Sequence, residues 1–169
     1  MIEQEFIKYS ADKLTQLSSR IQDCLGRLNA DQVWLRNTEN ENAIGNLVLH
    51  LCGNLGQWIG SGVAGKPDTR QRDQEFAARG HASPTELAER LNNVVTETVG
   101  IIRDLPPRRL SEHVTVQKYD VTVTEAIYHV VEHFGQHTGQ IIFATKLLTG
   151  QDLGYYKHLH QPKHFETTP

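Results

Sequence analysis

The sequence is poor in cysteine and has no basic cluster. Its two cysteines, Cys24 and Cys52, form no CxxC pair. This argues against the disulfide framework of small secreted domains, and each thiol is predicted to be buried. The formal net charge is -3, and no run of lysine or arginine occurs. Nucleic-acid binding normally needs a basic surface that displaces counterions, so that class of function is excluded.

Long apolar runs are also missing. No segment approaches the roughly 18–20 apolar residues that a membrane-spanning helix needs, so no membrane partner is expected. The first residues, MIEQEFIKYSADKL, carry acidic side chains early and are amphipathic, unlike a signal or transit peptide. These features predict a cytoplasmic protein. A length of 169 residues is typical of one domain.

Apolar residues recur at three- and four-residue intervals in four long segments, which is the period of an amphipathic helix. The first helix is predicted over residues 2–28. The second is predicted to begin at a capping box of Thr38 and Glu41 and to fade near Gly60, Gly62 and Gly65.

The third predicted helix begins at SPTE, where Ser83 would cap, Pro84 would take the first position and Glu86 would complete a capping box. The fourth runs from about 122–124 to Thr149 and stops at Gly150. Four such helices in one chain predict an all-α fold, a four-helix bundle.

The segments between the helices differ in character. Residues 66–81 are polar and charged, and predict a long surface loop between the second and third helices. The stretch HVTVQKYDVTV predicts a short extended segment or an isolated hairpin before the last helix. We expect residues 1–152 to form the bundle and residues 153–169 a C-terminal tail.

The stretch HVVEHFGQHTGQ carries His129, His133 and His137 at intervals of four. On a helix, His133 and His137 lie about 40° apart, one turn above the other, so both imidazoles can converge on one ion. Gln140 lies on the same face. His129 is about 80° round from His137, so it is expected to be a bystander.

A third ligand is available on the second helix. His50 lies among leucines, with Asn46 and Asn54 four residues to either side. A single histidine on an apolar face is more often a core residue bonded to a carbonyl. Together with the His133/His137 pair on another helix, His50 favours a metal site. Core histidines without a metal stay the alternative.

Glycines flank these histidines. Gly135 and Gly139 each cost about 1 kcal/mol relative to alanine inside a helix. Two interpretations stay open: the glycines keep space around an ion, or they allow close helix packing without any ligand. Gly53 and Gly56 invite the same two interpretations on the second helix.

The motifs GNLVLHLCGN and HVVEHFGQHTGQI resemble the DinB-like superfamily of metal-binding four-helix bundles, here an uncharacterised bacterial branch. The resemblance covers nearly the whole chain and implies that His50, His133 and His137 are the ligands. The family often has histidine and arginine where this chain has Gln136 and Thr138. That departure leaves the three ligands intact.

Three histidines leave one open position on a four-coordinate ion, the pattern of a catalytic site. The metal expected is zinc or nickel, and imidazole also suits iron. The catalytic group would be water or a thiolate held at the ion. Asn54, Gln140 and Glu132 are candidates for hydrogen bonds to the ligands. Glu132 has the alternative of a solvated surface acid.

The resemblance implies a metal-dependent hydrolase or a transferase that uses a low-molecular-weight thiol, with a small-molecule substrate and a homodimeric assembly. The alternative is a non-catalytic, dimeric helical bundle that binds a metal or small ligand. A cleft beside the three histidines would distinguish the two. His158, His160 and His164 fall in the polar tail and are expected to be solvated.

Overall fold

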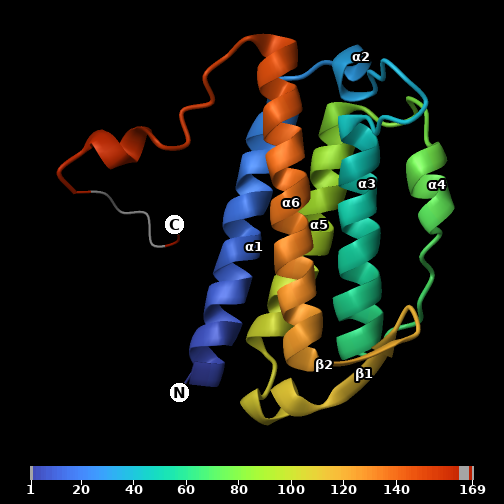
Figure 1. Cartoon of the computed structure of the whole chain (residues 1–169), viewed down its shortest axis with the longest axis vertical. Coiled ribbons are helices and arrows are strands. Elements are labelled where there is room, and N and C mark those ends of the chain that lie inside the picture. The colour runs from blue at the N-terminus through green and yellow to red at the C-terminus, as the bar shows by residue number, and fades with distance from the viewer. Residues whose placement is uncertain (1, 164–167, 169) are drawn as a thin grey trace.

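A computed structural model describes residues 2–163 and 168 of the protein. The chain is mostly helical (68%) and carries a small two-stranded sheet, so the prediction of a helical fold is confirmed. The longer helices lie side by side (Figure 1). The α-helices are α1 (Ile2–Gly26), α2 (Ala30–Val33), α3 (Ile44–Leu55), α4 (Arg72–Ala77), α5 (Pro84–Arg103) and α6 (Val123–Thr149).

Shorter elements complete the chain. The helix α3 continues as a π-helical segment, η1 (Gly56–Val63), and two 3₁₀ turns follow later, η2 (Pro107–Ser111) and η3 (Lys157–His160). None of the helices in residues 2–163 is long and apolar enough to cross a membrane.

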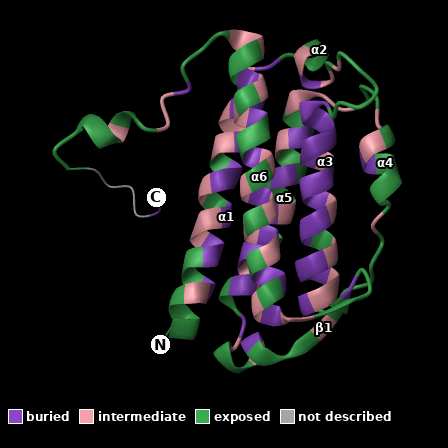
Figure 2. Cartoon of the chain, in the orientation of Figure 1, coloured by how far each residue is buried: buried purple, intermediate pink, exposed green. Residues whose placement is uncertain are grey.

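The core lies between the long helices. Figure 2 shows buried residues along the faces that the helices turn toward one another, and α3 is buried along most of its length. On α1 the buried positions include Ile7, Leu14 and Ile21, spaced as a helical stripe. Complete burial of one such side chain stabilises the fold by about 1.5–3 kcal/mol. Cys24 and Cys52 are buried free thiols, as predicted.

The ends of α5 and α6 follow local sequence rules. The Ser83 side chain accepts the backbone N–H of Glu86, and Glu86 in turn accepts the N–H of Ser83, the predicted capping box. The helix α6 begins after Thr122 and ends at Gly150, whose φ of 67° places it in the left-handed region. Both starts and the glycine stop agree with the prediction.

The start of α3 differs from the prediction. The Thr38–Glu41 capping box is wrong, because the helix begins at Ile44 and Glu41 accepts the backbone N–H of Asn37 instead. Asn46 Oδ1 accepts the N–H of Ala43 at 3.1 Å, so the first turn is capped from inside the helix. Asn46 also donates to backbone carbonyls of Glu75 and Ala78, so a residue with tertiary contacts sets the start of α3.

The segment 66–81 also differs from the predicted surface loop. It contains the short helix α4, which packs on α3. Glu75 of α4 and Arg70 before it have side-chain exposures of only 10% and 4%. The sequence carried no apolar period here, because the buried groups are charged and paired with each other.

The stretch before α6 forms a hairpin of β1 (His113–Val116) and β2 (Tyr119–Thr122), in antiparallel register with Val116 opposite Tyr119. Gln117 and Lys118 take positive φ angles of 51° and 69° at the two-residue turn. The hairpin alternative of the prediction is therefore the correct one. It lies across one end of the helices (Figure 1).

The C-terminal segment returns to α1. Leu153 is buried, and the Tyr155 hydroxyl lies 2.9 Å from the Asp23 carboxylate. His160 is exposed and His158 is half-buried, so the expectation of a solvated residue holds for His160. His164 lies outside the described residues.

Candidate metal centre

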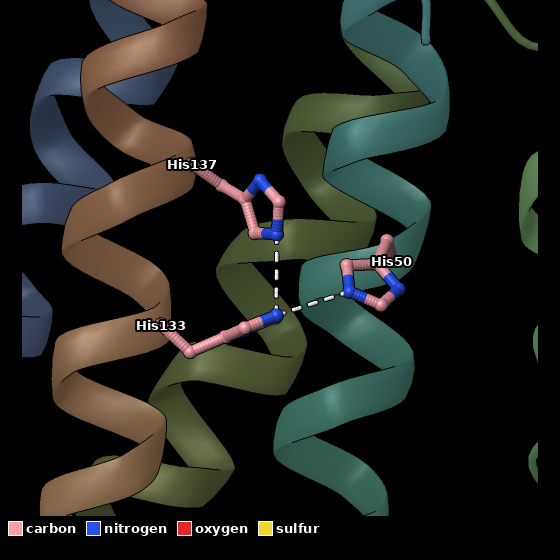
Figure 3. A group of neighbouring side chains, drawn as sticks. All are labelled: His50, His133 and His137. Atoms are coloured by element: carbon pink, nitrogen blue, oxygen red, sulfur yellow. Dashed lines mark hydrogen bonds between the residues drawn. The ribbon is translucent and has the colours of Figure 1, made fainter. Parts of the chain in front are cut away.

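Three histidines from two helices converge at one point (Figure 3). His133 and His137 lie one turn apart on α6, and His50 faces them from α3. The Nε2 atom of His133 is 3.1 Å from His50 Nε2 and 3.2 Å from His137 Nε2. One ring nitrogen of each histidine lies within 4.8 Å of the others. The structure thus brings together the three histidines that the sequence singled out.

The spacing of these nitrogens suits a small divalent ion. Zinc–imidazole bonds of 2.0–2.1 Å in tetrahedral geometry place two ligand nitrogens about 3.3–3.4 Å apart. The two Nε2 separations, 3.1 and 3.2 Å, are close to that value. Three ring nitrogens that face one another so closely cannot all carry protons, so lone pairs point into the gap between them.

The outer nitrogens of two rings have partners that settle which nitrogen carries the proton. His137 Nδ1 donates to Gln140 Oε1 at 2.7 Å, and His50 Nδ1 donates to Glu75 Oε2 at 2.9 Å. With the proton on Nδ1, the Nε2 atom of each ring is free to bind a metal. His133 Nδ1 is buried and has no hydrogen-bond partner among the described residues.

Arg70 and Glu75 form a buried pair behind His50. Arg70 Nε donates to Glu75 Oε1 at 2.8 Å, and Nη2 donates to Oε2 at 2.9 Å, which is a bidentate arrangement. Burial raises the pKa of Glu75, but the hydrogen bonds from Arg70 and His50 outweigh burial and hold the pKa below its usual value. Glu75 is therefore a carboxylate at neutral pH.

Arg70 Nη2 also lies 3.0 Å from His50 Nδ1. Arginine can only donate, so this contact competes with the bond from His50 to Glu75 for the Nδ1 position. Arg70 Nη2 already donates to the carboxylate, and a bond from an N–H to a carboxylate is the stronger one. We therefore assign the Nδ1 proton of His50 to the bond with Glu75.

Gly53 allows this approach. A methyl group at Gly53 would overlap the Glu75 carboxylate, so any larger residue would push α4 away from α3. Gly139 is different, since a methyl group there would meet nothing within 4 Å, and at Gly135 it would only reach Leu17 at 3.9 Å. Close packing is therefore not the reason for the two glycines on α6.

Two imidazoles of the cluster, those of His133 and His137, are held neutral. Burial, reinforced by the neighbouring His137 and His50 rings, lowers the pKa of His133 to about 3. Burial also lowers the pKa of His137, against the opposing hydrogen bond to Gln140. At neutral pH these two rings are therefore uncharged and offer lone pairs. A metal cation requires ligands in this deprotonated form.

The other candidate residues lie beside the cluster. His129 packs on Trp58 with ring centroids 4.0 Å apart, and its Nε2 is 3.5 Å from Asn54 Nδ2. Glu132 is exposed and accepts a hydrogen bond from Gln136. Asn54, Gln140 and Glu132 were predicted to hydrogen-bond to the metal ligands. Among the described residues, only Gln140 does so, through His137.

The sequence did not predict the roles of Arg70 and Glu75. They lie in the segment interpreted as a surface loop, 20 and 25 residues beyond His50. One signal was present: Arg70 and Glu75 are spaced by five residues in a stretch where the chain has to cross from one helix to the next. That spacing alone does not indicate burial.

The chain matches the model of a family described as "Protein of unknown function (DUF1572)" over residues 1–163. It is similar to a solved structure described as the crystal structure of the conserved protein of locus from Enterococcus faecalis. The two share 16% sequence identity with a TM-score of 0.68, over 85% of this chain and 97% of the other. At this identity the likeness concerns the fold alone. No curated protein matches the sequence.

Proposed function

The chain belongs to the DUF1572 family, whose function is unknown, and we propose that it is a metal-dependent enzyme with one three-histidine site. His50, His133 and His137 are the proposed ligands. The observation that carries the proposal is the convergence of their Nε2 atoms, with separations of 3.1 and 3.2 Å about His133. The histidine cluster itself is compatible with a divalent metal.

We further propose that the fold is a four-helix bundle of the DinB-like type. The packing of α1 on α5 and α6, and of α3 on α5 and α6, supports this assignment. So do the positions of the histidines, on the second and the last of the long helices. The resemblance of the two sequence motifs points to the same superfamily.

Zinc or nickel is the proposed metal, with iron as a third option, because neutral imidazole suits all three. A divalent ion bound there would supply Lewis-acid chemistry, which suits hydrolysis of a small substrate or transfer of a low-molecular-weight thiol. The protein contributes the orientation of the ligands: Glu75 holds the ring of His50, and Gln140 holds the ring of His137.

A second candidate is a non-catalytic, dimeric metal-binding bundle. One observation favours it: the 680 Å³ cleft beside α3 is lined by Arg70 and Glu75 but by none of the three histidines. His133 and His137 are nevertheless only half-buried, so solvent reaches part of these two side chains. The two candidates differ in whether substrate binds next to the ion.

The first test is the metal content of the protein, measured by plasma mass spectrometry after purification without a nickel column or chelator. We expect about one zinc, nickel or iron per chain in the wild type and none in His133→Ala. His129→Ala is the matched control, because His129 lies on the same helix but outside the cluster, and it should keep the metal. Circular dichroism would verify that each variant is folded.

Absence of metal in the wild type, with no uptake when each ion is added, would overturn the proposal. If metal is present, the holoprotein and the metal-stripped protein are compared in thiol-transfer and ester- or amide-hydrolysis assays. Turnover that requires the metal supports an enzyme. A stoichiometric metal without turnover in either assay supports the non-catalytic bundle.

A further inference from the structure

A cleft of about 680 Å³ opens between α3, η1, α5 and the segment 66–75. Small-molecule sites typically measure about 300–1,000 Å³. None of the three clustered histidines lines the cleft. The cleft and the histidine cluster nevertheless share one wall, because Arg70 and Glu75 line the cleft and also contact His50.

The floor of the cleft is backbone. Gly56 and Gly60 line it one turn apart, and a methyl group added at either would meet nothing within 4 Å. Gly60 is buried by the surrounding residues, yet the space above it is open. Two helical glycines sacrifice helix stability here, and the open space above them is the cleft itself.

Part of the wall is apolar, and one buried hydroxyl lies beside it. Leu49 and Ile101 are half-buried hydrophobic residues that pack against the core, and burial raises the pKa of the Cys52 thiol to about 12, so that thiol is neutral. Thr98 is 2% exposed and lines the cleft. Unlike the hydroxyls of Thr138, Thr145 and Thr149, the Thr98 hydroxyl bonds to no backbone carbonyl within the described chain.

The cleft is lined by three cationic side chains and three carboxylates, so its formal charge is balanced, but one of the cations has no carboxylate partner among the described residues. Lys66 pairs with Glu97, and Arg70 pairs with Glu75. The carboxylate of Asp68 accepts hydrogen bonds from Gln57 and from the backbone of Arg70. Arg90 lines the cleft and pairs with no carboxylate or carbonyl in residues 2–163.

We propose that this cleft binds a small organic anion with an apolar body. The apolar part would lie over Gly56 and Gly60 between Leu49 and Ile101, and the anionic group would pair with Arg90. A neutral ligand would leave Arg90 unused, and a cation would face it directly. This binding site is separate from the histidine cluster, so it stands whether or not the protein holds a metal.

The probe for the test is 8-anilinonaphthalene-1-sulfonate, an apolar fluorophore with one anionic group, titrated against the full-length protein. The neutral analogue N-phenyl-1-naphthylamine is titrated in parallel. We expect saturable binding of the sulfonate with one site per chain.

Gly60→Leu fills the floor of the cleft and should raise the Kd of the sulfonate at least tenfold. If this variant does not fold, Gly56→Leu should raise the Kd in the same way. Gly100→Leu is the control, since Gly100 also has open space around it but lies outside the cleft.

Arg90→Gln should raise the Kd for the sulfonate about threefold to tenfold, and leave the Kd for the neutral analogue unchanged. Arg108→Gln, an exposed arginine outside the cleft, is the matched control and should leave both unchanged. The proposal is overturned if no saturable binding occurs or if Gly100→Leu weakens binding as much as Gly60→Leu. It is also overturned if Arg90→Gln has the same effect on both probes.

Discussion

Glu75 controls the orientation of one proposed ligand. Its carboxylate accepts from His50 Nδ1 and is itself held by two hydrogen bonds from Arg70. The three side chains are at most 10% exposed, so water competes little with these bonds. A buried carboxylate of this kind fixes the ring and makes its other nitrogen a better metal ligand.

Replacing Glu75 with glutamine should therefore weaken metal binding by about 10- to 100-fold, measured by competition with a chelating dye. The substitution also leaves Arg70 with a buried charge lacking its counter-charge, so the thermal midpoint should fall. Glu97→Gln is the control, because Glu97 pairs with Lys66 at the surface, away from the histidines. Equal affinity in wild type and Glu75→Gln would show that Glu75 does not support the site.

Within α3 and α6, glycines serve different purposes. Gly53 of α3 faces the Glu75 carboxylate, whereas Gly139 of α6 faces open space. The same substitution by alanine thus has opposite consequences in the two helices. On α3 it creates an overlap, and on α6 it only removes the conformational freedom of glycine in the unfolded chain.

We expect Gly53→Ala to destabilise the protein by about 1–3 kcal/mol, as other insertions into a packed contact do. Gly139→Ala should stabilise it by up to about 1 kcal/mol. Urea denaturation followed by circular dichroism measures both. A stabilising Gly53→Ala would mean that α4 moves away from α3 without loss.

The C-terminal segment is an element that packs on α1. Leu153 is buried, and Tyr155 packs under the Arg20 guanidinium, 5.4 Å from the ring centre. We propose that residues 1–152 fold by themselves and that the tail adds stability.

Deletion of residues 153–169 should keep the helical circular dichroism spectrum and lower the free energy of unfolding by about 1–3 kcal/mol, the scale of one buried leucine. Tyr155→Phe in the full chain should account for part of that loss, because it removes the hydrogen bond to Asp23. Complete unfolding of the shortened chain would place the tail inside the domain.

At the scale of the whole molecule, the histidine cluster makes the stability of the metal-free protein depend on pH. The pKa of His133 falls from its usual 6.5 to about 3, and burial also lowers the pKa of His137 and that of His129, which lies next to the cluster. In the unfolded chain these rings take up protons near pH 6.5, whereas in the folded chain they resist it. The stability that depends on these neutral rings is therefore fully present above pH 6.5, and it is lost progressively as the pH falls toward 3.

The thermal midpoint of the protein in chelator should drop between pH 7 and pH 5, above the range in which the carboxylates titrate. His133→Asn should flatten that slope, and His160→Asn, a change in the exposed tail, should not. An unchanged slope in His133→Asn would contradict the assignment of the pH effect to the cluster.

Several features of the fold follow from contacts between residues three or four apart, and these the sequence by itself determined. The helical stripe of α1, the Ser83–Glu86 cap, the Gly150 stop and the spacing of His133 and His137 all depend on the geometry of one helix. Such interactions are local, so they are visible in the order of residues. That the three histidines bind a metal stays a prediction.

The support of His50 was decided only by the tertiary structure. Glu75 reaches His50 across 25 residues of chain, and Asn46 is drawn into contacts with Arg36 and the carbonyl of Ala78, which moves the start of α3 to Ile44. Charged and amide groups have no hydrophobic period that would reveal burial. Whether they become buried depends on finding partners far away along the chain, because an unpaired buried charge is too costly to keep. The path of the segment 66–81 across α3 supplies those partners, and only the folded chain specifies that path.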